Sequence, residues 1–146
     1  MQKKIEAVIF DLDGVIVSTD GQHFEAWRAI AQQEGIAFDR RDNDKLRGVS
    51  RMESLEILLG DKKDCYTDTQ KAALAEQKNT CYKELIQKLG KRNILPGVKQ
   101  LLCSLREAGV KLAIGSASKN TETILQKIGL KDAFEVVVTG NDIQRT

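Results

Sequence analysis

Four hydrophobic segments of this chain have the length and composition expected for an α/β domain. Residues 7–10, which read AVIF, are apolar at every position, and this predicts a strand buried on both faces of a parallel sheet. Residues 110–114 and 134–139 predict two further strands, and residues 120–128 predict a helix between them. The order strand, helix, strand predicts a parallel α/β unit.

The segment 20–91 has a helical pattern instead. Apolar residues recur at helical spacing over 24–31, and residues 50–53 and 67–70 have the spacing of capping boxes at two further helix starts. Another helix, with one apolar face, is expected over 98–108. We therefore expect a helical module inserted between the first strand of the α/β unit and this later helix.

Composition and charge narrow the functional classes. The chain has 146 residues, a formal net charge of +2 and 41% hydrophobic residues, which is typical of a globular domain. It has no basic cluster for nucleic acid and no apolar run near the roughly 20 residues of a membrane span, so neither partner is expected. Three cysteines without metal-site spacing argue against a disulfide framework or a zinc site and favour a cytoplasmic location.

Two carboxylates directly follow the first predicted strand. Asp11 and Asp13 therefore lie where open α/β sheets bind ligands. A carboxylate such as Asp11 can accept a phosphoryl group and later release it, and Asp13 could then transfer the proton of the substrate hydroxyl. The alternative is structural, since Asp and Gly are common in turns and helix caps. The local pattern leaves both interpretations open.

The motif around these residues resembles a known family signature. Residues 10–16, FDLDGVI, resemble the DxDG motif of the haloacid dehalogenase superfamily, and Ser116 in IGSASKN matches the second motif of that superfamily. Within it, the whole chain is most similar to the β-phosphoglucomutases. The segments QHFEAW at 22–27, LRGVSR at 46–51 and EQKN at 76–79 carry that resemblance.

The resemblance implies a fold and a chemistry. It implies a partial three-layer, parallel-sheet (Rossmann-like) α/β core, over 1–17 and 93–146, with an inserted helical cap domain over 18–92 that closes over it. Asp11 would become an aspartyl phosphate, and Mg²⁺ would be held by the carboxylate of Asp11 and the backbone carbonyl of Asp13. Ser116 would hydrogen-bond the transferring phosphoryl group.

The resemblance also implies the substrate contacts. Arg51 would grip the distal phosphate of a sugar phosphate, and the loop before it would line the sugar. The predicted catalytic residues are Asp11 and Asp13, and the predicted substrate-binding residues are His23, Trp27, Gly48, Val49, Ser50, Arg51, Ser54, Lys78, Ser116, Ala117, Ser118, Lys119 and Asn120.

Several of these residues have structural alternatives. His23 could relay a proton or orient Asp13, or could be purely structural. Helical spacing explains Trp27 as core, and Lys78 on a polar helix is ordinarily a solvated charge. Arg51 could be a solvated arginine, although a forked cation beside free backbone N–H groups is also a good phosphate clamp. Lys119 and Asn120 could simply start a helix.

The sequence departs from the family pattern in two places. Ser18 stands where the related enzymes usually carry Asp. After residues 140–146 the family would continue into a Lys-Pro motif and two strands with acidic residues that complete the Mg²⁺ shell. Without those strands the first strand becomes an apolar edge, which predicts self-association or pairing with a missing C-terminal segment.

Three functions remain open at this stage. The first is a Mg²⁺-dependent phosphomutase that interconverts β-glucose 1-phosphate and glucose 6-phosphate. The second is a sugar-phosphate phosphatase of the same superfamily, in which water attacks the aspartyl phosphate. The third is a non-catalytic binding or assembly module, because the 146-residue chain lacks the family's later motifs.

Overall fold

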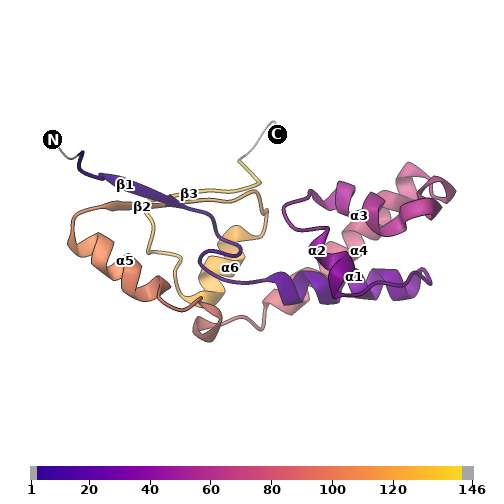
Figure 1. The fold of residues 1–146 in the computed structure, drawn as a ribbon, viewed down its shortest axis with the longest axis horizontal. Coiled ribbons are helices and arrows are strands. Elements are labelled where there is room, and N and C mark those ends of the chain that lie inside the picture. The colour runs from indigo at the N-terminus through magenta and orange to yellow at the C-terminus, as the bar shows by residue number, and fades with distance from the viewer. Residues whose placement is uncertain (1–2, 143–146) are drawn as a thin grey trace. The chain divides into compact units, whose positions relative to one another are not determined.

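The computed structural model describes residues 3–142, which divide into two compact units (Figure 1). One unit contains residues 3–20 and 86–142 and is called the α/β unit. The other, Gly21–Leu85, is called the helical unit. The predicted domain boundaries at 17/18 and 92/93 stay predictions. Of the predicted continuation at 140–146, residues 143–146 lie outside the described residues.

The α/β unit is built on a parallel sheet of three strands. These are β1 (Ala7–Phe10), β2 (Lys111–Gly115) and β3 (Val136–Val138), in the order β1-β2-β3. The register pairs Phe10 with Ile114, and Ile114 with Val137. The predicted parallel α/β architecture is therefore confirmed, with strand limits shifted by one or two residues.

Two helices, α5 (Val98–Glu107) and α6 (Thr121–Ile128), cover one face of this sheet (Figure 1). Alternate strand residues point to that face, because successive side chains of a strand point to opposite sides. Phe10, Leu112 and Ile114 are buried there, and the Phe10 ring packs edge-on against Phe134 at 6.3 Å between centroids. Repeated apolar residues on α6 complete this core, namely Ile124, Leu125 and Ile128.

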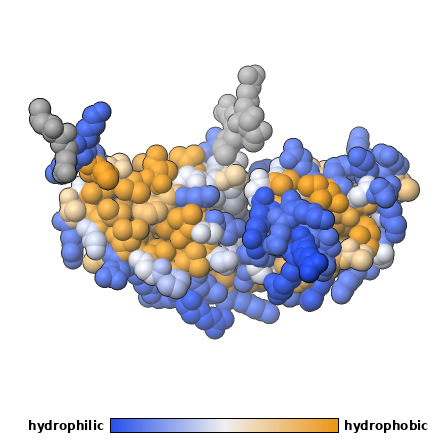
Figure 2. Space-filling view, in the orientation of Figure 1, coloured by the Kyte–Doolittle hydropathy of each residue, from blue (hydrophilic) through white to orange (hydrophobic). Residues whose placement is uncertain are grey.

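The prediction that β1 is buried on both faces is wrong for the described residues. Ile9 is 75% exposed, and Val136, which shares its register position across the sheet through Ala113, is 54% exposed. The helices cover only the face that carries Phe10, so these branched side chains face solvent. Figure 2 shows a broad hydrophobic area over the α/β unit.

Strand β1 also forms an edge of the sheet, as predicted. Within residues 3–142 it pairs with β2 alone. The backbone groups on its other side therefore have no ladder partner in the described part of the chain, which is the usual starting point for pairing with another polypeptide.

The helical unit contains most of the segment that was expected to be helical. Trp27, Leu55, Leu59 and Leu74 are buried in one cluster that joins its helices. The elements are α1 (Asp20–Gln33), α2 (Arg40–Asp44), α3 (Arg51–Leu59), the 3₁₀ helix η1 (Gly60–Cys65) and α4 (Asp68–Ile86), followed in the α/β unit by the 3₁₀ helix η2 (Lys91–Asn93).

Of the two predicted capping boxes, the one before α4 forms both of its bonds and the one before α3 forms only the bond to the Ser50 side chain. The Ser50 hydroxyl accepts the Glu53 amide at 3.4 Å before α3. Before α4, Gln70 and Thr67 form a reciprocal capping box, with side-chain to backbone distances of 2.9 and 3.1 Å. Asn120 behaves differently from its prediction: it precedes α6 without making a side-chain cap bond.

No helix within residues 3–142 combines the length and apolar character that a membrane crossing requires. Cys65, Cys81 and Cys103 are free thiols.

Candidate functional site

The Asp11 and Asp13 side chains lie in a tight loop at the carboxyl end of β1. An Asp11 carboxylate oxygen accepts the amide of Leu12 at 2.7 Å, and an Asp13 oxygen accepts the amide of Thr19 at 2.9 Å. Both aspartates are exposed, whereas Leu12 is fully buried between them. Leu12 therefore anchors the loop in the core, and Asp11 and Asp13 on either side of it face solvent.

The loop owes its shape to local backbone bonds. The Leu12 carbonyl accepts the amides of Val15, Ile16 and Val17 at 3.3, 2.9 and 3.2 Å. Gly14 has φ +81°, a left-handed conformation that an L side chain disfavours, and its amide donates to the Val17 carbonyl at 2.7 Å. Gly14 of the motif is therefore required by the turn, whatever the chemistry beside it.

A second polar turn, residues 116–120, follows β2 and is called the Ser116 turn. Ser116 is buried, and its hydroxyl accepts the Ser118 amide at 3.2 Å. The Ser118 hydroxyl accepts the Asn120 amide at 3.1 Å, and its carbonyl accepts the Thr121 hydroxyl at 2.8 Å. These bonds fold the turn tightly before α6 begins, while Ala117 and Lys119 remain exposed.

Parallel pairing brings the two turns to the same edge of the sheet. Because Phe10 lies opposite Ile114, Asp11 and Gly115 leave the sheet at the same level, and Ser116 follows directly. The structure thus places Asp11 and the Ser116 turn at the same edge of the sheet, with Asp13 two residues further along the chain, and the roles of these residues stay predictions.

The oxygen donors of this edge fit a hard cation such as Mg²⁺. Exposed carboxylates and backbone carbonyls are the ligands that Mg²⁺ takes from proteins, together with several waters. Within residues 3–142, no group of three or more His, Cys, Asp or Glu side chains is placed to hold a metal ion. Asp11 and Asp13 would therefore supply only part of an octahedral shell.

The helical unit carries a separate group of predicted residues around the start of α3. Gly48 turns the chain with φ +72°, and Ser50 caps the helix. Arg51 is the first helical residue and is half-buried, and the buried Ser54 hydroxyl donates to the Val49 carbonyl at 3.5 Å. The loop is thus tied to the helix that it precedes, with Arg51 beside the unsatisfied N–H groups of the first turn.

A third group surrounds Lys78 on α4. Lys78 is only 4% exposed, and its Nζ lies 2.9 Å from Nδ1 of His23. The same nitrogen lies 4.9 Å from the ring centre of Trp27 and 4.7 Å from that of Tyr82. The His23 ring stacks on Tyr82 at 4.2 Å. An ammonium group in this cage gains cation–π attraction as well as a nitrogen partner.

These contacts decide between the structural alternatives that the sequence left open for Lys78 and Trp27. The expectation that Lys78 is a solvated charge is wrong, because helix α4 packs this position inward. The core interpretation of Trp27 is confirmed, since the residue is 3% exposed within the apolar cluster. The roles of both residues toward a substrate stay predictions. Tyr82 was missed, although its position four residues after Lys78 places it on the same helix face.

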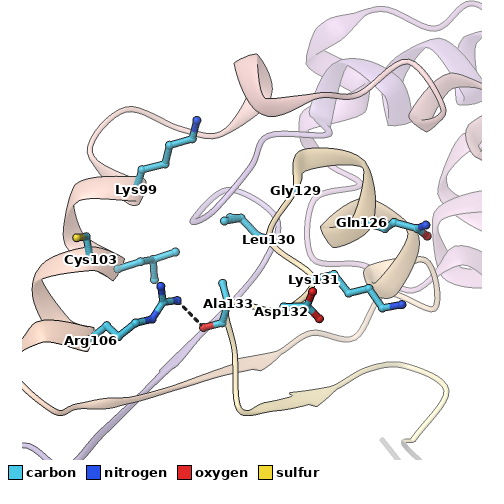
Figure 3. A pocket seen from close by; sticks show the side chains of 10 residues that line it. Lys99, Cys103, Arg106, Gln126, Gly129, Leu130, Lys131, Asp132 and Ala133 are labelled. Atoms are coloured by element: carbon cyan, nitrogen blue, oxygen red, sulfur yellow. Dashed lines mark hydrogen bonds between the residues drawn. The ribbon is translucent and has the colours of Figure 1, made fainter.

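A cavity of about 520 Å³ lies elsewhere, between α5 and the segment after α6 (Figure 3). Lys99, Cys103 and Arg106 line it from α5, and the Arg106 guanidinium donates to the Ala133 carbonyl at 3.1 Å. None of the predicted site residues lines this cavity.

We compared the sequence of this chain with protein families and with curated proteins. The haloacid dehalogenase-like hydrolase family matches residues 5–145. A β-phosphoglucomutase of Bacillus subtilis is 44% identical over 136 residues, covering 92% of this chain and 60% of that protein. A phosphorylated carbohydrates phosphatase of Thermotoga maritima is 31% identical over 144 residues, covering 96% of this chain and 63% of that protein.

Solved structures give the same result for the fold. The crystal structure of a β-phosphoglucomutase from Clostridium difficile superposes with a TM-score of 0.89 at 39% identity, and the match covers 98% of this chain and 65% of that one. The chain spans about three fifths of the length of these curated relatives.

Proposed function

Because the chain belongs to the haloacid dehalogenase-like hydrolase family, we propose that it carries the nucleophile and the sugar-phosphate contacts of a Mg²⁺-dependent phosphotransferase. The observation that carries this proposal is the position of Asp11, Asp13 and the Ser116 turn at one carboxyl edge of the parallel sheet. Ligands of open α/β sheets bind at this edge.

The chemistry follows from two carboxylates with different roles. An oxygen of Asp11 forms a bond to phosphorus as the bond from phosphorus to the donor oxygen breaks, and that donor oxygen takes a proton from Asp13. In the second step, an acceptor hydroxyl gives its proton to Asp13 while its oxygen displaces the Asp11 carboxylate from phosphorus. The first step leaves phosphorylated Asp11 and deprotonated Asp13, and the second step returns both to their starting forms, so atoms and protons balance over the two steps.

Charge stabilisation is the other requirement of phosphoryl transfer. Mg²⁺ held by the Asp11 carboxylate and the Asp13 backbone carbonyl would supply positive charge beside the phosphoryl oxygens. Ser116 donates a hydrogen bond to one of these oxygens, with Ala117, Ser118, Lys119 and Asn120 completing the turn around them. Since the described residues supply only part of a metal shell, further oxygen donors or waters complete it.

The helical unit supplies recognition of the sugar phosphate. The Arg51 guanidinium binds the phosphate that is not transferred, because a planar fork of donors matches phosphate geometry. Gly48, Val49 and Ser50 line the sugar together with Ser54. His23, Trp27 and Lys78 form a second group of proposed substrate contacts. The half-buried position of Arg51 at a helix start supports this role.

As substrates we propose β-glucose 1-phosphate and glucose 6-phosphate, interconverted through a bisphosphate. Similarity to the β-phosphoglucomutases at 44% and 39% identity supports this choice. Similarity to the phosphorylated carbohydrates phosphatase at 31% favours the alternative, in which water is the acceptor. A coupled glucose 6-phosphate assay with β-glucose 1-phosphate, run beside a phosphate-release assay, separates them. Dominant phosphate release would overturn the mutase proposal.

A non-catalytic binding module is the second candidate. The open metal shell and the uncovered sheet face of the described residues favour it. Calorimetric binding of glucose 6-phosphate without any turnover would support this candidate. Turnover by the 146-residue chain that disappears in Asp11→Asn would exclude it.

We further propose that the open edge of β1 pairs with another polypeptide. The proposed partner is a second copy of this chain or the C-terminal segment that the family pattern predicts. Light scattering of this chain alone, and after addition of the corresponding segment of a relative, tests the pairing. Self-association of this chain through the edge would be seen as a dimer without the added segment. A cytoplasmic location stays part of the proposal.

A further inference from the structure

The Ser116 turn rests on a second backbone segment, residues 139–142, which directly follows β3. Two hydrogen bonds join the turn to this segment: the Gly140 amide donates to the Ser118 carbonyl at 3.2 Å, and the Asn141 side chain donates to the Lys119 carbonyl at 3.1 Å. A third bond, from the Ser116 amide to the Val138 carbonyl at 3.0 Å, joins the turn to the end of β3. Two of the hydrogen bonds that hold the turn in place therefore come from the 139–142 segment.

The 139–142 segment has its own internal support. Thr139 is 1% exposed, and both its amide and its hydroxyl donate to the Asp142 carboxylate, at 2.8 and 3.2 Å. The Asn141 amide donates back to the Thr139 hydroxyl at 3.1 Å. A segment closed by its own hydrogen bonds keeps its shape, so it can act as a fixed support for the turn above it.

Gly140 marks the closest approach of the two segments. A Cβ atom at this position would lie 2.1 Å from the Ala117 carbonyl oxygen and 3.0 Å from the carbonyl carbon. Both of these are backbone atoms, so no side-chain rotation relieves the overlap. Any residue other than glycine must separate the backbone at position 140 from the Ala117 peptide, which lies between Ser116 and Ser118.

We propose that Gly140 is a positioning residue for the phosphoryl site: the absence of a side chain at Gly140 sets where the Ser116 hydroxyl and the following amides lie. This inference rests on the proposed function, in which the Ser116 turn holds the phosphoryl group. A misplacement of about 1 Å in such a contact can lower the rate by about 10²-fold. Gly140 itself touches no substrate in this proposal.

The test compares Gly140→Ala with Gly90→Ala in the 146-residue chain. Gly90 is the matched control because a Cβ there meets nothing within 4 Å and its φ is not in the left-handed range. Amide NMR spectra report the geometry of residues 116–120, and titration with inorganic phosphate reports binding at the same amides. We expect Gly140→Ala to shift these amide signals and to weaken phosphate binding by about tenfold or more, the scale of one lost phosphate contact. We expect Gly90→Ala to do neither.

The outcomes distinguish the positioning role of Gly140 from the proposed phosphate binding by the Ser116 turn. Unchanged 116–120 amide signals in folded Gly140→Ala would overturn the positioning role, whatever the phosphate result. If phosphate perturbs none of these amides in the unmodified chain, the proposed function of the Ser116 turn fails, while shifted signals in Gly140→Ala still support the steric relationship.

A milder variant covers the case in which Gly140→Ala does not fold. Asn141→Ala removes the hydrogen bond to the Lys119 carbonyl without adding any atom near the turn. We expect smaller shifts at residues 119 and 120 and a smaller loss of phosphate affinity. Signals and affinity equal to those of the unmodified chain would overturn the support by the 139–142 segment.

Discussion

Nζ of Lys78 lies 2.9 Å from Nδ1 of His23, across a gap of 55 residues in sequence, and links helix α4 to helix α1. Two aromatic rings surround this contact: His23 stacks on the Tyr82 ring, and the Lys78 ammonium group lies over the Trp27 ring. A buried charge that loses a polar partner keeps its desolvation cost, so the two residues should be energetically coupled.

We expect His23→Phe, which keeps a ring on Tyr82, to lower the free energy of unfolding by about 1–3 kcal/mol. Lys78→Met should cost less, because it removes the charge together with its need for a partner. The double variant should therefore be less destabilised than the sum of the single variants. Urea unfolding of the four proteins measures this difference, and strict additivity would contradict the coupling.

The Lys71–Glu56 ion pair predicts a stability change at high pH. Lys71 Nζ lies 2.7 Å from the Glu56 carboxylate, and this hydrogen bond raises the pKa of Lys71 above its usual 10.5. A raised folded-state pKa stabilises the fold fully below the unfolded-state pKa, and this contribution disappears as pH rises through the folded-state value. The free energy of unfolding of Lys71→Met should thus approach that of the unmodified protein as the pH rises through the raised folded-state pKa of Lys71.

The control for this prediction is Lys45→Met. Lys45 is 68% exposed and lies 3.6 Å from Asp42, so its pair should contribute little at any pH. If Lys71→Met lowers the free energy of unfolding by the same amount from neutral to strongly alkaline pH, the Lys71–Glu56 hydrogen bond is not the cause of the loss.

The Asp39 cap predicts the opposite dependence at low pH. The Asp39 side chain accepts the Asp42 amide at 2.9 Å, and this bond lowers the pKa of Asp39 below 3.8. A lowered folded-state pKa stabilises the fold above the unfolded-state pKa, and this contribution is lost as pH falls through the folded-state value. Asp39→Asn keeps a capping oxygen but does not titrate, so it should remove this part of the acid sensitivity.

Asp39→Ala should instead destabilise helix α2 at every pH, because it removes the capping oxygen. Acid titrations of helix content for the two variants measure the difference. If Asp39→Asn loses stability with falling pH as steeply as the unmodified protein, the assigned role of the carboxylate is wrong.

Because one face of the sheet is uncovered, we expect β1 to tolerate truncation of an apolar side chain on that face with little loss of stability. Ile9 is 75% exposed while Ile114, on the next strand, is 1% exposed. We expect Ile9→Ala to change the free energy of unfolding by no more than about 0.5 kcal/mol, and Ile114→Ala to cost about 2–5 kcal/mol. Equal costs in denaturant unfolding would show that Ile9 is covered in solution.

The sequence was sufficient to predict features that depend only on neighbouring residues, such as a helix cap or the end of a strand. The capping box Thr67–Gln70 formed as predicted, and Ser50 caps α3 through the Glu53 amide, because capping depends on residues three apart. The strand that ends before Asp11 also formed, because the uninterrupted apolar run is followed at once by polar residues. Parallel pairing then placed Asp11 and Ser116 at one edge.

Features that depend on distant packing were not predictable. Exposure of Ile9 depends on which face the helices cover, and an all-apolar strand reads the same whether one face or both are covered. Burial of Lys78 depends on contacts with His23 and Trp27, more than 50 residues earlier in the sequence. The close approach of Gly140 to Ala117 has no local signal, since an ordinary turn glycine looks the same.

The central claim is that the Asp11 carboxylate bonds to phosphorus. Fluorine NMR of the protein with Mg²⁺ and beryllium fluoride, a mimic of a bound phosphoryl group, measures this directly, with Asp11→Asn and Asp13→Asn as matched variants. We predict protein-bound fluorine signals that vanish in Asp11→Asn and persist in Asp13→Asn, together with shifts at the Ser116 turn amides. Bound signals that persist unchanged in Asp11→Asn would contradict the account.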